Sequence, residues 1–172
     1  TWEQINYHPD YKPPGVNYLA ILRPFASGST ADAYVNSQTF SVVGGVNYEM
    51  SAYLGRAYSP DVYMMVVWLD ASGGIISTAR TTGAVGGFGP TLASYTRVFA
   101  NVLAPANAAS AFGRLAMGPQ SGQDYNMLFA MLPYFGVATG PQQTQPSPWS
   151  PSGVGTLIHG GVLKTNTVTA DR

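Results

Sequence analysis

Aromatic side chains are the residues of this sequence best suited to bind a ligand. A Tyr or Trp ring offers an apolar face on which a sugar ring stacks, and the Tyr hydroxyl adds a polar group. Strands are rich in aromatics for packing reasons too, so a core or half-buried role stays open for most of them. An odd spacing separates Tyr63 and Trp68, so only one of these two rings can face the core. The predicted ligand-binding residues are Tyr58, Tyr63, Trp68, Phe88 and Tyr125.

The acidic residues do not form a catalytic pair in the sequence. Glycosidic hydrolysis needs two facing carboxylates, whereas most of the eight acidic residues fall in predicted turns. Asp61 and Asp70 lie at opposite ends of one predicted strand, roughly 30 Å apart at about 3.3 Å per residue. His8 and His159 lie in the flanks and complete neither a Ser-His-Asp set nor a metal centre. We therefore predict that the protein is not an enzyme.

Composition excludes further functional classes. Eight basic and eight acidic residues cancel and no basic cluster occurs, so we expect no nucleic-acid partner. The absence of Cys removes disulfides and thiolate sites. No apolar run reaches the roughly 18 residues of a membrane-spanning helix, so we expect no membrane insertion. The glycine-rich run 83–89 lacks the Lys-Ser/Thr ending of a phosphate loop, and we interpret it as an exposed contact loop that carries Phe88.

Turn residues divide the chain into short strand-like segments. Residues 46–56 alternate best, with apolar side chains on one face and Glu49, Ser51 and Tyr53 on the other. Residues 62–69 are apolar on both faces, which is typical of a strand that is covered on both sides. The remaining predicted strands cover residues 18–22, 38–43, 75–80, 94–103, 111–117 and 127–137, with a hairpin loop over 70–74 and with Pro133 marking an edge position or a bulge.

The predicted fold is all-β, a β-sandwich of the jelly-roll type with about eight antiparallel strands. Twenty Gly, thirteen Pro and only 9% charged residues suit short strands joined by many turns. The alanine-rich stretch 104–116 is the one helical alternative, and Pro105 and Gly113 argue against it. We predict an irregular lead-in over 1–15, a sandwich domain over 16–139, and an extended Pro/Gly-rich exit peptide and linker over 140–172.

Four segments in a fixed order resemble the carbohydrate-binding-module jelly rolls of glycoside hydrolases and phage tail proteins. They are YEMSAY at 48–53, VVWLDASGGI at 66–75, YTRVFANVLAP at 95–105 and LFAMLPYFG at 128–136. Such modules often carry an Asp in the last strand and bind a structural calcium, but Ala130 stands at that place here. We therefore predict no cofactor, with a structural calcium as the alternative.

The C-terminal run 160–172, GGVLKTNTVTADR, resembles a short segment of phage tail tip and central-fibre proteins of the host-specificity type. The resemblance implies a domain of a longer virion protein, located at the tail tip and acting extracellularly at the host surface. It also implies a homotrimer that contacts other tail proteins and attaches to a host cell-surface polysaccharide. Two alternatives stay open: a purely structural module that trimerises and spaces the tail tip, and an ancillary carbohydrate-binding module of a secreted polysaccharide-degrading enzyme.

Overall fold

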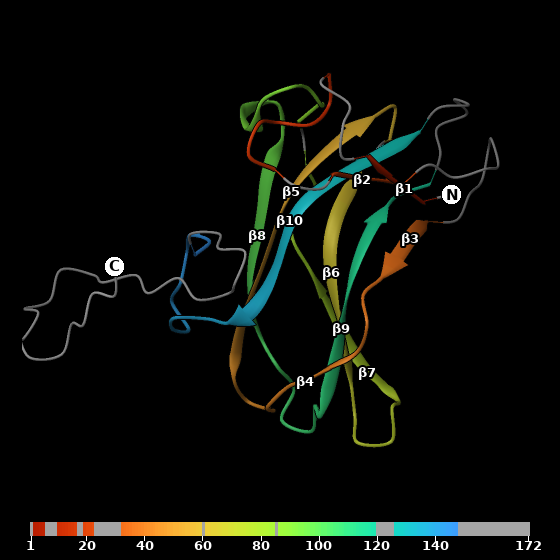
Figure 1. The fold of residues 1–172 in the computed structure, drawn as a ribbon. Coiled ribbons are helices and arrows are strands. Elements are labelled where there is room, and N and C mark those ends of the chain that lie inside the picture. The colour runs from red at the N-terminus through yellow and green to blue at the C-terminus, as the bar shows by residue number, and fades with distance from the viewer. Residues whose placement is uncertain are drawn as a thin grey trace, which may run out of the picture.

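Two antiparallel β-sheets packed face to face make up the fold (Figure 1). The computed structural model describes residues 2–5, 10–16, 19–22, 32–59, 61–84, 86–119 and 126–147. Within these ranges the one helical element is the 3-10 turn η1 (Leu92–Ser94), and no helix there has the length and apolarity needed to cross a membrane. The predicted all-β jelly-roll sandwich is confirmed.

Each sheet draws its strands from distant parts of the chain. Sheet A runs in the order β1 (Trp2–Ile5), β2 (Leu19–Leu22), β10 (Met127–Val137), β5 (Asn47–Ala57) and β8 (Thr96–Leu103). Sheet B runs in the order β3 (Ala33–Asn36), β9 (Ser110–Met117), β6 (Val62–Leu69) and β7 (Ile75–Arg80), and the short β4 (Phe40–Ser41) pairs with β9. The chain therefore crosses repeatedly from one sheet to the other, as it does in a jelly roll.

The segments with the clearest patterns coincide with observed strands. The predicted strands 62–69, 75–80 and 127–137 match β6, β7 and β10 residue for residue. The prediction misses β1, which lies in the expected irregular lead-in, and β3, which lies between the predicted strands 18–22 and 38–43. Both strands are four residues long. Such short segments carry too little alternation to be recognised, and they form because β2 and β9 offer them a pairing edge.

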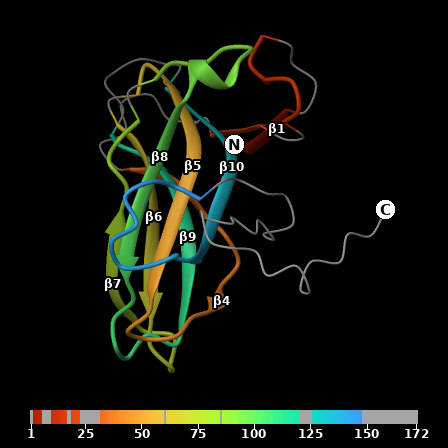
Figure 2. The same ribbon diagram turned by 90° about the vertical axis from the view of Figure 1, so that its left-hand side faces the viewer.

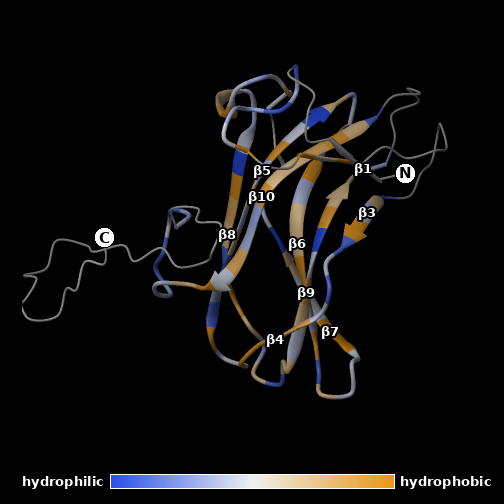
Figure 3. Cartoon of the chain, viewed as in Figure 1, coloured by the Kyte–Doolittle hydropathy of each residue, from blue (hydrophilic) through white to orange (hydrophobic). Residues whose placement is uncertain are grey.

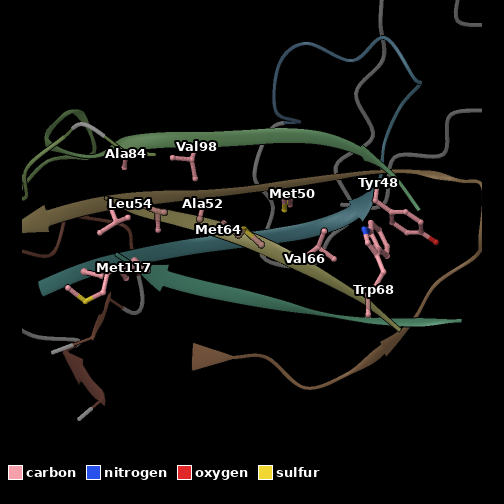
Figure 4. Packing of buried hydrophobic residues seen from close by; sticks show 14 of the residues in the cluster. Tyr48, Met50, Ala52, Leu54, Met64, Val66, Trp68, Ala84, Val98 and Met117 are labelled. Atoms are coloured by element: carbon pink, nitrogen blue, oxygen red, sulfur yellow. The ribbon is translucent and has the colours of Figure 1, made fainter. Parts of the chain in front are cut away.

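The core between the sheets depends on alternation along β5 and β6. Trp68 is 1% exposed, and its ring lies 5.8 Å from the Tyr48 ring and 6.0 Å from the Phe135 ring. Figure 4 shows the facing side chains of the two strands, and Figure 3 shows the hydrophobic residues along β6. The inward-facing residues of β5 and β6 are Tyr48, Met50, Ala52, Leu54, Val62, Met64, Val66 and Trp68.

A β-bulge interrupts β10 at Pro133. The register between β10 and β5 shifts between Met131 and Tyr134, and Leu132 adopts a positive φ of 51°. The predicted bulge is confirmed, and the pairing of β10 with β2 covers only Leu128–Ala130, so Pro133 lies beyond the part of β10 that has a paired strand on both sides. A bulge suits proline, which has no N–H to donate to the neighbouring strand. The extra residue leaves Met131 and Tyr134 on the same face of sheet A.

Two segments cover the outer face of sheet A, the face turned away from sheet B. Residues 10–16 form the first cover, in which the Tyr11 ring lies 5.7 Å from the Phe129 ring and Val16 is buried. Residues 138–147 form the second cover, which we name the strap. Figure 2 shows this blue segment crossing in front of β8 and β5. The described part of the predicted exit peptide therefore folds back on the sheet, while the domain boundaries themselves stay predictions.

Asp70 organises the predicted hairpin between β6 and β7. Its Oδ1 accepts hydrogen bonds from the Ser72 hydroxyl at 2.6 Å and from the backbone N–H groups of Ser72 and Gly74, both at 2.8 Å. The hairpin is thus confirmed. The bond from the Ser72 hydroxyl, followed by those from the backbone, holds the pKa of the Asp70 carboxyl below its ordinary value.

We expect the stability of this hairpin to depend on the Asp70 carboxylate. Because the folded pKa is lowered, its contribution is present above the ordinary carboxyl pKa and is lost as the pH falls through the folded value. An NMR titration of the side-chain carboxyl carbons measures this directly. Asp70→Asn should flatten the acid side of the stability curve, and an Asp70 that titrates at the ordinary value would contradict the hydrogen bonding described above.

Candidate functional site

Three cross-strand rungs organise the outer face of sheet A beneath the strap. Each rung joins residues of β10, β5 and β8 that lie directly opposite one another, so neighbouring Cβ atoms are roughly 5 Å apart. We call this set the rung face. Its rungs are Gly136, Glu49 and Asn101; then Tyr134, Ser51 and Phe99; then Met131, Tyr53 and Arg97.

The rung face mixes aromatic rings with charged and polar groups, unlike the core behind it. The guanidinium carbon of Arg97 lies 5.6 Å from the centre of the Tyr53 ring, which is a cation–π contact. Tyr53, Arg97 and Phe99 are partly exposed, whereas Glu49 and Ser51 are buried. One end of the face is therefore open to solvent and the other end is closed.

Gln143 holds the strap together from within. Its Oε1 accepts hydrogen bonds from the backbone N–H of Thr139 at 2.8 Å and from the Thr139 hydroxyl at 3.2 Å. Its backbone N–H donates to the Gly140 carbonyl at 3.2 Å, and its Nε2 donates to the Gln145 carbonyl at 2.9 Å. These bonds bend the strap into a turn and direct the amide nitrogen of Gln143 towards the sheet.

The strap supplies the hydrogen bonds of a buried carboxylate. Glu49 is 0% exposed. Its Oε2 accepts from Nε2 of Gln143 and from the Ser147 hydroxyl at 2.7 Å, and the Ser147 backbone N–H lies 3.2 Å from Oε1. A carboxylate withdrawn from water without donors costs several kcal/mol, whereas charge-assisted bonds offset that cost. Glu49 and the strap therefore stabilise each other.

The strap also accepts hydrogen bonds from β8. Nδ2 of Asn101 donates to the carbonyls of Gly140 at 2.9 Å and Gln143 at 3.4 Å, and Nη2 of Arg97 donates to the Ser147 carbonyl. Oδ1 of Asn101 is buried and has no hydrogen-bond partner among the described residues. One segment thus engages polar groups of the first and third rungs and leaves a single acceptor of Asn101 unsatisfied.

Tyr134 brings its hydroxyl close to Glu49. A Cβ added at Gly136 would collide with this hydroxyl, so glycine at 136 leaves the room that the ring needs. Burial, followed by the nearby charge of Glu49, raises the pKa of Tyr134 above its ordinary value. The Tyr134 hydroxyl therefore stays protonated beside the carboxylate.

Two of the predicted ligand-binding residues lie on opposite faces of sheet B. The opposite orientation of Tyr63 and Trp68 is as predicted, and Trp68 is the ring that enters the core. We accordingly assign Trp68 to packing, because no ligand reaches a ring that is 1% exposed between two sheets. Tyr63 is 5% exposed, donates to Oδ2 of Asp32 at 2.9 Å and lies under the Arg80 guanidinium at 4.5 Å. Burial and the Asp32 bond raise its pKa.

The other predicted residues lie away from the rung face or outside the described ranges. Tyr58 follows β5 and is 66% exposed, with a positive φ of 57°. Phe88 is 41% exposed and stacks on Phe129 at 4.7 Å, so it helps to hold the first cover. Tyr125 lies outside the described residues. Binding roles for Tyr58, Phe88 and Tyr125 stay predictions.

Sequence reasoning groups Glu49, Ser51 and Tyr53 on one strand face but assigns them no binding role. Their partners on β8, β10 and the strap become neighbours only through sheet pairing and chain reversal. One signal was available in the sequence. Glu49 is a charged residue in the middle of a well-alternating strand, in a chain with only eight acidic residues, and such a residue is rarely buried without a partner.

The described residues offer no cluster for a metal ion. No group of three or more His, Asp or Glu residues comes together in this part of the chain. Ala130, where the resemblance implies an Asp, is 2% exposed and points into the core between the sheets. His8 and His159 lie outside the described residues. The absence of a cofactor stays a prediction.

Known proteins share the fold of this chain at low sequence identity. No protein-family model matches the sequence, and no curated protein matches it. The enzymatically active domain of tailspike protein 4 of bacteriophage CBA120 has a TM-score of 0.58 at 13% identity, covering 80% of this chain and 18% of that one. The CBM22-1–GH10 modules of Clostridium thermocellum xylanase 10B, in complex with xylohexaose, have a TM-score of 0.51 at 12% identity, covering 80% and 24%. This chain spans less than a quarter of either protein, and the likeness shows a common fold.

We expect Glu49→Gln to weaken the attachment of the strap. The substitution keeps the size of the side chain but turns an NH₂ group towards the donors of Gln143 and Ser147. The free energy of unfolding should fall by about 1–3 kcal/mol, the usual cost of leaving buried hydrogen-bonding groups unpaired. Urea denaturation measures this change. Gln142→Ala, at the exposed neighbour of Gln143, is the control and should stay within about 0.5 kcal/mol of wild type.

Proposed function

We propose that this chain is a non-catalytic saccharide-binding module that serves host attachment in a virion tail. The rung face is the observation that carries the proposal. There, the rings of Tyr53 and Phe99 lie beside the guanidinium of Arg97, the amide of Asn101 and the carboxylate of Glu49, all on one face of sheet A.

This combination of groups suits the chemistry of a saccharide. The C–H face of a sugar stacks on an aromatic ring, while its hydroxyls donate to carboxylates and accept from amide and guanidinium groups. The partly exposed Tyr53 and Phe99 offer the rings, and Arg97 beside them offers a charged donor. A face that runs across three strands accommodates an extended chain better than a single small molecule. A polysaccharide is therefore the ligand class that we propose.

Host attachment is the finer part of the proposal. It rests on the resemblance of residues 160–172 to phage tail tip and central-fibre proteins. The fold shared with a phage tailspike domain is compatible with it, and the xylanase modules in complex with xylohexaose support a saccharide as the ligand class. On this proposal the module lies at the host surface and binds a cell-surface polysaccharide. It forms a homotrimer, and the trimer contacts other tail proteins.

Multi-angle light scattering of the purified chain tests the proposed assembly. A trimer that binds polysaccharide is the expected result. A trimer that binds nothing would favour the structural spacer, and a monomer that binds would favour an independent carbohydrate-binding module.

Tyr53→Ala should weaken saccharide binding by about tenfold, equivalent to about 1.4 kcal/mol, because it removes a stacking ring. The measurement is binding to an array of bacterial surface polysaccharides that also carries xylohexaose. Tyr34→Ala is the matched control. Like Tyr53, the exposed Tyr34 lies under an arginine, with the guanidinium carbon of Arg114 3.9 Å from the centre of its ring. Unlike Tyr53, it lies on the outer face of sheet B.

Other outcomes of the same assay would place the binding site elsewhere or reject saccharide binding. Equal losses from Tyr53→Ala and Tyr34→Ala would remove the rung face from the proposal. A loss confined to Tyr58→Ala, Phe88→Ala or Tyr125→Ala would place binding at those predicted positions instead. Binding by none of the proteins would reject the saccharide-binding function.

A further inference from the structure

The strap is attached to the rung face by hydrogen bonds and not by a shared core. None of residues 138–147 is buried, and neither buried apolar cluster includes any of them. The first cover differs, because Val16 is 3% exposed and packs in the same cluster as Phe129. Segments with few buried apolar contacts open at low free-energy cost. The strap can therefore leave sheet A while the sandwich stays folded.

The contacts of the strap have the hydrogen-bonding character of a saccharide. Glu49 accepts from a hydroxyl, an amide nitrogen and a backbone N–H, all supplied by Gln143 and Ser147. Asn101 and Arg97 donate to backbone carbonyls of the strap. A sugar hydroxyl donates and accepts, so a saccharide chain on the rung face can satisfy both sets of groups.

The strap leaves part of the face unsatisfied. Nδ2 of Asn101 donates to the Gly140 carbonyl of the strap, but Oδ1 of the same side chain is buried beneath the strap without a hydrogen-bond partner among the described residues. A buried acceptor without a donor carries a free-energy cost. A hydroxyl that donates to Oδ1 of Asn101 would remove that cost. The strap thus satisfies the hydrogen-bonding groups of the rung face only in part.

We propose that the strap is a built-in competitor for the rung face. This inference rests on the saccharide-binding function proposed above. In the free protein the strap occupies Glu49 and Asn101, and a saccharide that binds over these residues displaces it. Because only the open form binds at this end of the face, the apparent dissociation constant equals the intrinsic one divided by the open fraction. The strap therefore lowers the apparent affinity of the module. Only a polysaccharide that makes enough contacts to replace the strap binds over Glu49 and Asn101.

Two adjacent glutamines provide the test in the full chain. Gln143→Ala removes the amide that bonds Glu49 and closes the turn of the strap, whereas Gln142→Ala changes an exposed side chain. Ser147→Ala is the second variant if Gln143→Ala folds poorly, because it removes only the hydroxyl bond to Glu49. Each protein is titrated with the array polysaccharide that wild type binds best, and amide hydrogen exchange is followed over 138–147 and over β5.

We expect Gln143→Ala to bind that polysaccharide about tenfold more tightly, with faster exchange over the strap and unchanged protection of β5. Gln142→Ala should behave like wild type. Equal or weaker binding by Gln143→Ala, once exchange shows that its strap is released, overturns the inference but leaves the saccharide site in place. Binding by neither wild type nor variants rejects both the saccharide-binding function and the competing strap.

Discussion

The two faces of β5 impose opposite demands, and much of the structure serves to meet both. Side chains alternate along a strand, so the backbone that places Leu54 in the core also directs Tyr53 outward. A slip of one residue in register would drive the carboxylate of Glu49 between the sheets and expose Met50. The pairing of β5 with β10 on one side and β8 on the other is therefore strongly specified.

The bulge in β10 allows that strand to serve both faces as well. Before the bulge, Phe129 and Met131 point outward; after it, Tyr134 points outward and Phe135 points into the core. There the Phe135 ring stacks on Tyr48 at 5.2 Å. The single extra residue thus reverses the parity of β10. It joins an apolar outer surface at one end of the strand to a polar one at the other.

The two covers of sheet A reflect this division. The apolar end is closed by residues 10–16, whose Tyr11 and Val16 join a buried cluster with Phe129. Such a cover is held by the removal of apolar area from water and belongs to the folded domain. The polar end is closed by the strap, held by hydrogen bonds that water or a ligand hydroxyl can replace. The two covers therefore differ in what holds them, apolar burial for the first and hydrogen bonds for the second.

The sequence by itself determined the all-β class and the limits of the central strands, and it restricted Pro133 to an edge position or a bulge, because alternation and turn residues are local signals. It also separated Glu49 and Tyr53 from the core face of β5. For β6 both faces are apolar, so local pattern left open which of Tyr63 and Trp68 enters the core. Only the tertiary structure brought Asn101 and the strap to Glu49, and Arg97 to Tyr53 and the strap. Those contacts join residues far apart in the chain, and such pairings are decided by how the sheets assemble and not by any local pattern.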